Sequence, residues 1–302
     1  IGRVIWFKLL KFEKKILITG INGFLGSHLA KHLKSSFEVI GLEYSLDNLH
    51  RINSDNFKVY TTKKTSLEKI FKENNFHSVI HAATVYRRKE DPIFNLLDTN
   101  INLPVRLLEL CNIFSVNMFL NTDSFFNNTD YSYSYLSDYT LSKKQSLEWI
   151  KMLATKTPCK VINMKVFHMY GENDAKTKFI PSIIDKIKKN TSTIDLTPGE
   201  QTRDFIYVKD VVSAFQFVIE NYNDLNSFQE FDIGTGKSHS IKEIVLLIKA
   251  ITKSSTVLNF GSLHYRDGEI MASKVTNLKL IKMGWRARFK LKDGVKNCVK
   301  NV

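Results

Sequence analysis

Short apolar runs alternate with amphipathic stretches along the first half of the chain. Each run has the length of a buried strand, and the stretches between them carry apolar residues at helical spacing. The predicted strands are residues 15–19, 38–43, 57–62, 78–83, 116–122 and 161–167. The predicted helices are residues 27–36, 67–75, 103–114 and 141–155. Strands that alternate with helices indicate a parallel sheet, so this half predicts a doubly wound α/β domain.

The alternation weakens after Tyr170 and Gly171. Residues 179–189 and 240–251 are expected to be helices, and residues 204–220 a strand running into a helix. No repeat or low-complexity linker separates the two halves. We expect an amino-terminal extension over residues 1–14, an α/β domain over 15–168, and a smaller mixed α/β lobe over 169–302. This lobe is expected to be partly interleaved with the domain and to cover the carboxyl end of its sheet.

Composition narrows the class of protein. Hydrophobic residues make up 43% of the chain, a value typical of globular proteins rather than disordered ones. No apolar run reaches the roughly 18–20 residues that cross a bilayer, so we expect a soluble, cytoplasmic protein without membrane insertion. The cysteines Cys111, Cys159 and Cys298 stand far apart, which predicts neither a disulfide framework nor a metal site.

The charge balance points to an anionic small molecule. The chain has 44 Lys and Arg against 30 Asp and Glu, a net charge of +14. Most basic residues are Lys and they are scattered, whereas direct reading of bases relies mainly on Arg. We therefore expect no nucleic-acid partner, and interpret the charge as a solvated surface that partly steers an anionic ligand.

A glycine-rich turn between the first strand and the first helix predicts a dinucleotide site. The segment reads Gly20-Ile21-Asn22-Gly23-Phe24-Leu25-Gly26. Gly20 permits the tight turn, Gly23 lets the backbone approach a pyrophosphate, and Gly26 allows the helix to pack closely on the strand. Glu43 ends the second strand, 23 residues after Gly20, close to the spacing of about 20 expected for an acid that binds the adenosine ribose.

A tyrosine and a lysine four residues apart predict acid–base chemistry. Tyr139 and Lys143 would share one face of a helix, so the ammonium group can lower the pKa of the phenol. A phenol with such a pKa can donate a proton to a carbonyl oxygen as hydride reaches the carbon. The nearby tyrosines Tyr131, Tyr133 and Tyr135 lack a lysine at this spacing.

These motifs together resemble the extended short-chain dehydrogenase/reductase family, which comprises sugar-nucleotide epimerases, dehydratases and reductases. The spacing of the three glycines, the Tyr-x-x-x-Lys pair, and Tyr170-Gly171 occur in the family's order along residues 15–295. Further matches are His81-Ala82-Ala83 at the end of the fourth strand, Asn100 in the following helix, and Arg203-Asp204-Phe205 within residues 203–210. The resemblance implies a Rossmann-like fold, with His81, Ala82, Ala83, Asn100, Tyr139 and Lys143 at the nicotinamide cofactor.

The resemblance also implies a third catalytic group after the fifth strand. Thr122 fits the family's Ser or Thr that bonds the substrate oxygen, and Ser124 is the other candidate. Dehydratases carry a Glu at the position of Ser124, their base for eliminating water. Its absence here argues against dehydration and leaves reduction or epimerisation open.

The expected substrate is a nucleotide sugar. By resemblance, Arg203 and Arg266 would bind its diphosphate, and arginine suits bidentate phosphate contacts. His168 stands where many relatives have Asn, and Phe179 opens the first helix of the second lobe; both are further substrate-binding candidates. No metal is expected at the site.

Finer matches narrow the resemblance to the bacterial CDP-3,6-dideoxyhexose synthases. They lie in residues 196–215, in the run that begins at Asn100, and in the tail from Gly268 to Trp285. The implied reaction reduces CDP-4-keto-3,6-dideoxy-D-glucose at C4 with NADPH, giving CDP-abequose or CDP-paratose for O-antigen and lipopolysaccharide. Two alternatives remain open, a 4-epimerase with tightly bound NAD and a redox-silent dinucleotide sensor. We also expect a homodimer.

The residues and the resemblance disagree about the cofactor. Glu43 favours NADH, because a 2′-phosphate beside a carboxylate meets like-charge repulsion. The subgroup implies NADPH, which would require Lys63, Lys64 or Arg51 to reach the phosphate while Glu43 turns outward. We expect NADPH with modest discrimination against NADH.

Overall fold

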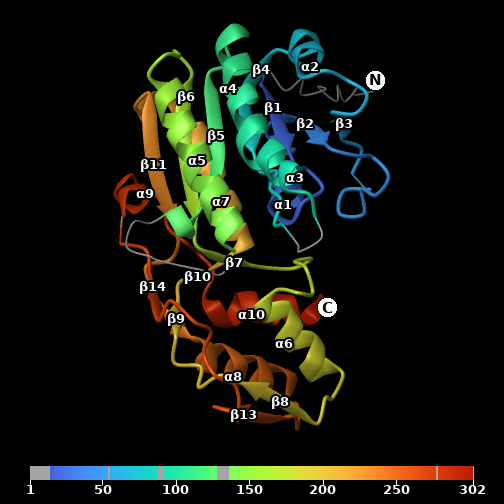
Figure 1. The fold of residues 1–302 in the computed structure, drawn as a ribbon, viewed down its shortest axis with the longest axis vertical. Coiled ribbons are helices and arrows are strands. Elements are labelled where there is room, and N and C mark those ends of the chain that lie inside the picture. Colours follow the sequence, from blue (N-terminus) through green and yellow to red (C-terminus); the bar gives the residue numbers. More distant parts are fainter. Residues whose placement is uncertain (1–13, 54, 88–90, 128–135, 277, 302) are drawn as a thin grey trace, which may run out of the picture.

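The computed structural model describes residues 14–53, 55–87, 91–127, 136–276 and 278–301, and it centres on one seven-stranded sheet (Figure 1). The spatial order is β11 (Phe228–Ile233), β6 (Lys160–Val166), β5 (Met118–Ser124), β4 (Phe76–His81), β1 (Lys15–Thr19), β2 (Glu38–Glu43) and β3 (Lys58–Thr61). Every neighbouring pair is parallel. The carboxyl ends of the strands therefore meet at one edge, where ligands bind in open α/β sheets.

Helices cover both faces of this sheet. Helices α1 (Phe24–Leu33) and α7 (Val208–Glu220) pack together on one face, while α2 (Leu67–Glu73), α4 (Leu103–Ile113) and α5 (Ser137–Ala154) lie on the other. Side chains alternate along a strand, so Ile16 and Ile18 of β1 join one buried cluster and Leu17 joins the other. Burial on both faces explains why the strands appear in the sequence as continuous apolar runs.

The second lobe lies beyond the carboxyl end of β6 (Figure 1). Its helices are α6 (Phe179–Lys188), α8 (Ile241–Thr252) and α10 (Leu291–Lys300), whereas α9 (Lys279–Lys282) lies against β11 of the large sheet. Its short strands form three small sheets: β7 (His168–Tyr170) with β10 (Phe205–Tyr207), β8 (Thr193–Leu196) with β13 (Val257–Phe260), and β9 (Thr202–Arg203) between β12 (His239–Ser240) and β14 (Ala272–Ser273). One buried cluster joins α1 and α7 to α6 and α8, so the lobe packs directly on the domain.

The predicted doubly wound sheet is confirmed, with strand ends shifted by up to two residues from the predicted bounds. The sequence did not predict β11, α10, or the short helix α3 (Ile93–Leu97) and the π-helical turn Asp98–Asn102 that follows it. Because β11 and α7 come from the second half, the two halves are interleaved in the sheet layer. The proposed boundary at residue 168 stays a prediction, and residues 1–13 of the extension lie outside the described part.

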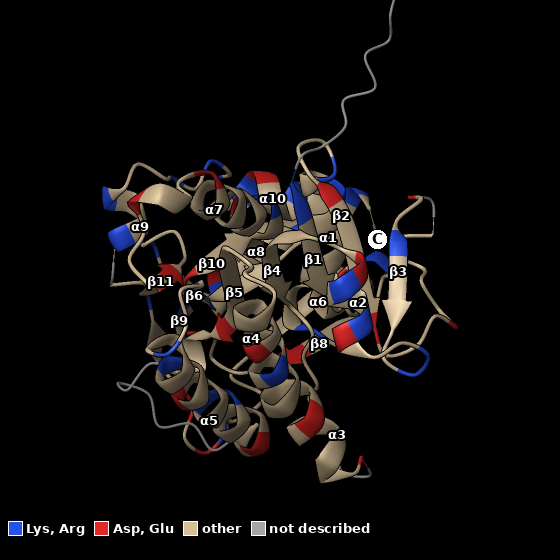
Figure 2. Ribbon diagram, turned by 90° about the horizontal axis from the view of Figure 1, so that it is seen from above, with Lys and Arg blue, Asp and Glu red and all other residues tan. Residues whose placement is uncertain are grey.

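Lys and Arg do not gather in one stripe over the described residues. They alternate with Asp and Glu along α2, α4 and α5 (Figure 2). Cys111, Cys159 and Cys298 are free thiols, each buried. Among the helices of the described segments, none combines the length and the apolar character needed to cross a membrane.

Candidate active site

The glycine turn joins β1 to α1 with almost no free space. Gly20 has a φ of +64°, and a Cβ there would lie 2.8 Å from the Cα of Ala83. A Cβ on Gly26 would lie 2.0 Å from the carbonyl oxygen of Gly20. Both positions therefore require glycine. The turn leaves the first amide groups of α1, from Phe24 and Leu25 onward, at the carboxyl edge of the sheet, where they can bind an anion.

Glu43 reaches this turn from the neighbouring strand. Its Oε1 accepts the backbone N–H of Asn22 at 2.5 Å, and burial raises the pKa of its carboxyl group. The side chain of Asn22 donates to the carbonyl of Asn48 and accepts the N–H of Arg51. These bonds fix Glu43 at the mouth of the glycine turn, where a carboxylate can accept a ribose hydroxyl.

Thr19 organises the end of β4. Its hydroxyl oxygen accepts the N–H groups of Ala82 and Ala83, each at 3.2 Å, and lies 3.0 Å from Nδ1 of His81. The hydroxyl proton must then point to Nδ1, which leaves the proton of a neutral imidazole on Nε2. Burial holds the pKa of His81 well below its usual range, and Nε2 has no partner among the described residues. His81 is therefore a neutral side chain with one donor left for a ligand.

The four candidate catalytic residues meet at the ends of β5 and α5. Nζ of Lys143 donates to the carbonyl of Thr122 at 2.9 Å and lies 6.0 Å from the ring centre of Tyr139. The phenol of Tyr139 interacts with the hydroxyl of Ser124. Oγ1 of Thr122 is buried and has no hydrogen-bond partner among the described residues. The group thus brings two hydroxyls and a phenol together, and the hydroxyl of Thr122 is left to bond a ligand.

The direction expected for the pKa of Tyr139 is wrong. Burial and the neighbouring Tyr86 raise this pKa well above 10, and Asp123 adds to the effect. Lys143 is itself buried, its pKa is lowered by that burial, and its ammonium group bonds a backbone carbonyl. The cost of burying a phenolate outweighs the attraction of a lysine at this distance. Tyr139 is therefore protonated and able to donate.

Tyr86 is a neighbour that the sequence did not reveal. Its ring stacks on Tyr139 with 4.4 Å between centroids and 23° between planes. Nζ of Lys178 lies 4.3 Å from the ring centre of Tyr86. The only sequence signal was that Tyr86 follows Ala83 by three residues. Tyr86 lies in a loop, so helical spacing could not indicate its contact with α5. The tyrosines Tyr131, Tyr133 and Tyr135 lie outside the described residues.

The side chain of Asn100 connects two parts of the chain by hydrogen bonds. It is buried in the π-helical turn, where its oxygen accepts from Val85 and Thr84 and its amide donates to Val85 and Ser142. These bonds tie the loop after β4 to α5. All side-chain polar atoms of Asn100 bond protein, and its contact with the cofactor stays a prediction.

The candidate substrate residues lie on the second lobe, in differing surroundings. Arg203 forms a buried ion pair with Glu269, which the sequence analysis did not anticipate. His168 lies 3.2 Å from the hydroxyl of Ser273, and burial beside Arg203 lowers its pKa to about 3. Arg266 is exposed, and Phe179 is half-buried at the start of α6.

Asp204, beside Arg203, accepts the N–H groups of Thr235 and Gly236 and so holds a loop in place.

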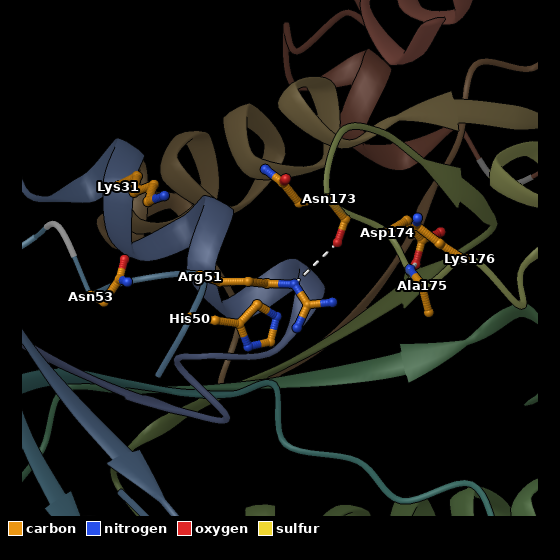
Figure 3. A pocket seen from close by; sticks show the side chains of 8 residues that line it. All are labelled: Lys31, His50, Arg51, Asn53, Asn173, Asp174, Ala175 and Lys176. Atoms are coloured by element: carbon orange, nitrogen blue, oxygen red, sulfur yellow. Dashed lines mark hydrogen bonds between the residues drawn. The ribbon is translucent and has the colours of Figure 1, made fainter. Parts of the chain in front are cut away.

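A cavity of about 450 Å³ opens beside the glycine turn (Figure 3). Arg51 lies between its two walls: Nε donates to the carbonyl of Asn173 at 3.1 Å, and a terminal nitrogen donates to the carbonyl of Asn22 at 3.3 Å. Lys31, His50 and Lys176 also line the cavity. No ion pair of Arg51 is found among the described residues, but the carboxyl group of Asp174 also lines the cavity, and the charge of Arg51 lowers the pKa of this carboxyl group against the larger raising effect of burial.

The site fits a nicotinamide dinucleotide. The glycine turn provides a cradle that any Cβ would fill, Glu43 provides an acceptor, and His81 and Thr122 carry buried polar atoms without partners among the described residues. His81 and Asn121 are paired in the register of β4 and β5, so these polar atoms lie on adjacent strands. A turn for the diphosphate after β1 and a phenol–lysine pair on α5 define an enzyme of the dinucleotide-dependent oxidoreductase class.

Comparison with known proteins identifies the family. The model of the NAD dependent epimerase/dehydratase family matches residues 16–234, and the chain belongs to this family. It is 32% identical to CDP-abequose synthase of Salmonella typhimurium (strain LT2) over 96% of this chain and 99% of that protein. It is 37% identical to CDP-abequose synthase of Salmonella muenchen over 95% of this chain and 98% of that protein.

Solved structures agree on the fold. UDP-glucose 4-epimerase of Thermus thermophilus in complex with NAD has a TM-score of 0.79 at 20% identity, covering 95% of this chain and 98% of that chain. UDP-glucuronic acid 4-epimerase of Bacillus cereus has a TM-score of 0.81 at 22% identity, with coverages of 95% and 98%. The Rossmann-like domain with its mixed second lobe is therefore shared across nearly the full length of these chains.

Proposed function

We propose that this enzyme reduces the C4 carbonyl of a nucleotide 4-keto deoxysugar, CDP-4-keto-3,6-dideoxy-D-glucose, to CDP-abequose. The observation that carries the proposal is the 32–37% identity to two CDP-abequose synthases over nearly the full length of each chain. The proposed diphosphate ligands are Arg203, which also pairs with Glu269, and Arg266 at an exposed position. The configuration at C4 is the most specific part of the proposal. Only the similarity to those two relatives supports it.

The catalytic residues support reduction rather than dehydration. Removing water from the sugar needs a base, and Ser124 stands where a dehydratase carries its carboxylate. Tyr139 is protonated and interacts with Ser124, so it can donate its proton to the carbonyl oxygen. Thr122 has an unused hydroxyl to bond the same oxygen. Lys143 orients the end of β5 through the carbonyl of Thr122. The bound reduced cofactor would supply the hydride.

We propose NADPH as the reductant, with Arg51 as the residue that binds the 2′-phosphate. Arg51 bonds Asn22, whose own N–H bonds Glu43, so the cation and the carboxylate flank one residue of the glycine turn. The adjoining cavity provides room for a phosphate (Figure 3). Glu43 opposes that phosphate by charge, and this supports weak discrimination between NADPH and NADH. Of the other two cations considered, Lys63 lies over the ring of Tyr44 and Lys64 is exposed.

Incubation with CDP-4-keto-3,6-dideoxy-D-glucose and NADPH tests the proposal. We expect one NADPH to be oxidised for each CDP-abequose formed, with the product assigned by NMR. Formation of CDP-paratose would overturn the stereochemistry only. A protein that carries oxidised NAD through gel filtration, and interconverts C4 epimers of nucleotide sugars without a reductant, would instead be a 4-epimerase.

A further inference from the structure

An aromatic row leads from Tyr139 toward Arg203. It consists of Phe126, Phe125 and His168. The ring of Phe126 meets that of Tyr139 nearly at a right angle, with 6.3 Å between centroids and 81° between planes. Phe126 packs on Phe125 at 4.1 Å, and Phe125 lies 4.2 Å from the ring of His168. Both phenylalanines belong to the short helical turn that directly follows β5, so the row begins at the catalytic end of that strand.

The far end of the aromatic row lies beside Arg203. Nε2 of His168 is 3.2 Å from the hydroxyl of Ser273, and Ser273 pairs with Arg203 in the register of β14 and β9. Burial and the charge of Arg203 lower the pKa of His168 to about 3, so His168 is neutral and adds no charge to the row. The row therefore lies between Tyr139, the candidate proton donor, and Arg203, the candidate ligand of the diphosphate.

The sugar of a bound substrate would lie along this row. C1 and C4 stand on opposite sides of a pyranose ring, so a diphosphate at Arg203 and a C4 carbonyl at Tyr139 place the sugar between them. Phe126 is half-buried and packs on a cluster of buried apolar side chains. The buried members of this cluster are Phe125, Phe167, Ile270 and Val275. Phe126 is therefore the member with the most surface left for a ligand.

The proposed substrate suits such a surface. In a 4-keto-3,6-dideoxyhexose, C3 beside the carbonyl is a methylene group, and C5 on the other side carries a methyl group. The ring of Phe126 offers contact to such carbons and no hydrogen bond. A hydroxyl group on C3 would lose its water against this ring without gaining a partner from it, which costs free energy.

We propose that Phe126 selects a sugar without a hydroxyl group at C3, by packing on that methylene while Tyr139 protonates the C4 oxygen. This inference rests on the proposed function and adds the residue that recognises the deoxygenated carbon. An apolar surface discriminates against an added hydroxyl by about 10²-fold. We expect kcat/KM to be higher by this factor for CDP-4-keto-3,6-dideoxy-D-glucose than for CDP-4-keto-6-deoxy-D-glucose, which differs only by the hydroxyl group on C3.

Phe126→Ser tests the proposal, because it removes the ring and admits water to C3. NADPH oxidation with the two substrates gives the ratio of their kcat/KM values, from which the concentration of active enzyme cancels. We expect this ratio to fall at least about tenfold for Phe126→Ser, and to stay within about threefold of wild type for Phe126→Leu, which keeps an apolar side chain. Phe126→Tyr keeps the ring and adds a hydroxyl group beside the sugar, so its ratio should also fall. This variant decides the test if Phe126→Ser does not fold.

Phe260→Ser is the matched control. Phe260 is also half-buried, but it lies in β13, at the far end of the second lobe (Figure 1). We expect the wild-type ratio for this variant. A wild-type ratio below about tenfold would overturn the proposal, and so would an unchanged ratio for Phe126→Ser. An equal fall for Phe126→Leu would also overturn it, since the loss would then not follow apolar contact. If the unaltered protein oxidises NADPH with neither substrate, the proposed function fails, and that failure is seen before any variant is compared.

Discussion

At the scale of single residues, Tyr139 carries the largest expected effect. Tyr139→Phe removes the proton that the carbonyl oxygen would receive, so kcat should fall by at least about 10²-fold. The ring and its packing remain, so cofactor affinity should stay within about twofold. NADPH oxidation and a fluorescence titration of bound NADPH measure the two quantities. Turnover close to wild type would remove Tyr139 from the role of proton donor.

The choice of cofactor depends on two side chains that flank Asn22. Glu43→Ala removes a negative charge from the 2′-phosphate side of the turn, so the ratio of kcat/KM for NADPH over NADH should rise about tenfold, equivalent to about 1.4 kcal/mol. Arg51→Met should lower the same ratio. Glu38→Ala is the control, because Glu38 lies at the other end of β2 and pairs with Lys15. Steady-state kinetics with both cofactors give the ratios, and an unchanged ratio for Glu43→Ala would refute its role.

Some residue-level chemistry could be predicted from the sequence, and some could not. The glycines and the Tyr139–Lys143 pair were identifiable because local spacing alone sets their geometry. Tyr86 and Glu269 were missed because each lies in a loop, where the sequence has no periodic pattern, and contacts a residue far away in the sequence. The pKa of Tyr139 was predicted in the wrong direction, since sequence reveals the neighbouring charge but not the degree of burial.

At the scale of elements, the Arg203–Glu269 pair fastens β9 to the segment before β14. Both side chains are largely buried, so Arg203→Ala leaves an unpaired carboxylate inside the lobe. We expect a loss of about 3–5 kcal/mol in the free energy of unfolding, and a smaller loss for the double variant Arg203→Ala/Glu269→Ala. Urea unfolding of the single and double variants measures this difference. A double variant less stable than Arg203→Ala would show that the unpaired carboxylate is not the cause.

This pair also changes the expected role of Arg203 in binding. The sequence suggested that Arg203→Ala would weaken only the nucleotide sugar. Because the guanidinium group is already held by Glu269, the loss of affinity should come with a loss of stability, and the two must be measured together.

The seventh strand shows why one element was missed. β11 contains Gln229, Glu230 and Asp232 and is only half-buried along most of its length, as suits an edge strand. An edge strand needs less apolar surface than a central one, so its sequence resembles a loop. Five of the other strands were predictable because burial on both faces requires apolar runs, whereas β3, the opposite edge strand, was predicted although it is only partly buried.

At the scale of the whole molecule, His168 should make stability depend on pH. Its pKa is about 3 in the fold, below the usual 6.5. Between these values the unfolded chain binds a proton that the folded chain does not, so acid favours unfolding. The free energy of unfolding should therefore fall as the pH decreases from about 6.5, with a contribution from this group of up to about 1.4 kcal/mol per pH unit.

His168→Asn tests this contribution, because asparagine can still bond Ser273 and does not titrate. Urea unfolding at several pH values between about 6 and 4.5 should give a shallower slope for this variant than for wild type. His264→Asn, at an exposed position, should keep the wild-type slope. Parallel slopes for His168→Asn and wild type would contradict the expected titration.

β11 also has a consequence for the newly made chain. A ribosome releases the amino-terminal part first, so β1 to β6 emerge well before Phe228–Ile233. Until β11 pairs with β6, the outer edge of β6 has unpaired N–H and C=O groups that another nascent chain can bind. Once β11 has been synthesised and has paired with β6, this edge is covered. The risk that the half containing Tyr139 aggregates through it then ends, whether or not substrate is bound.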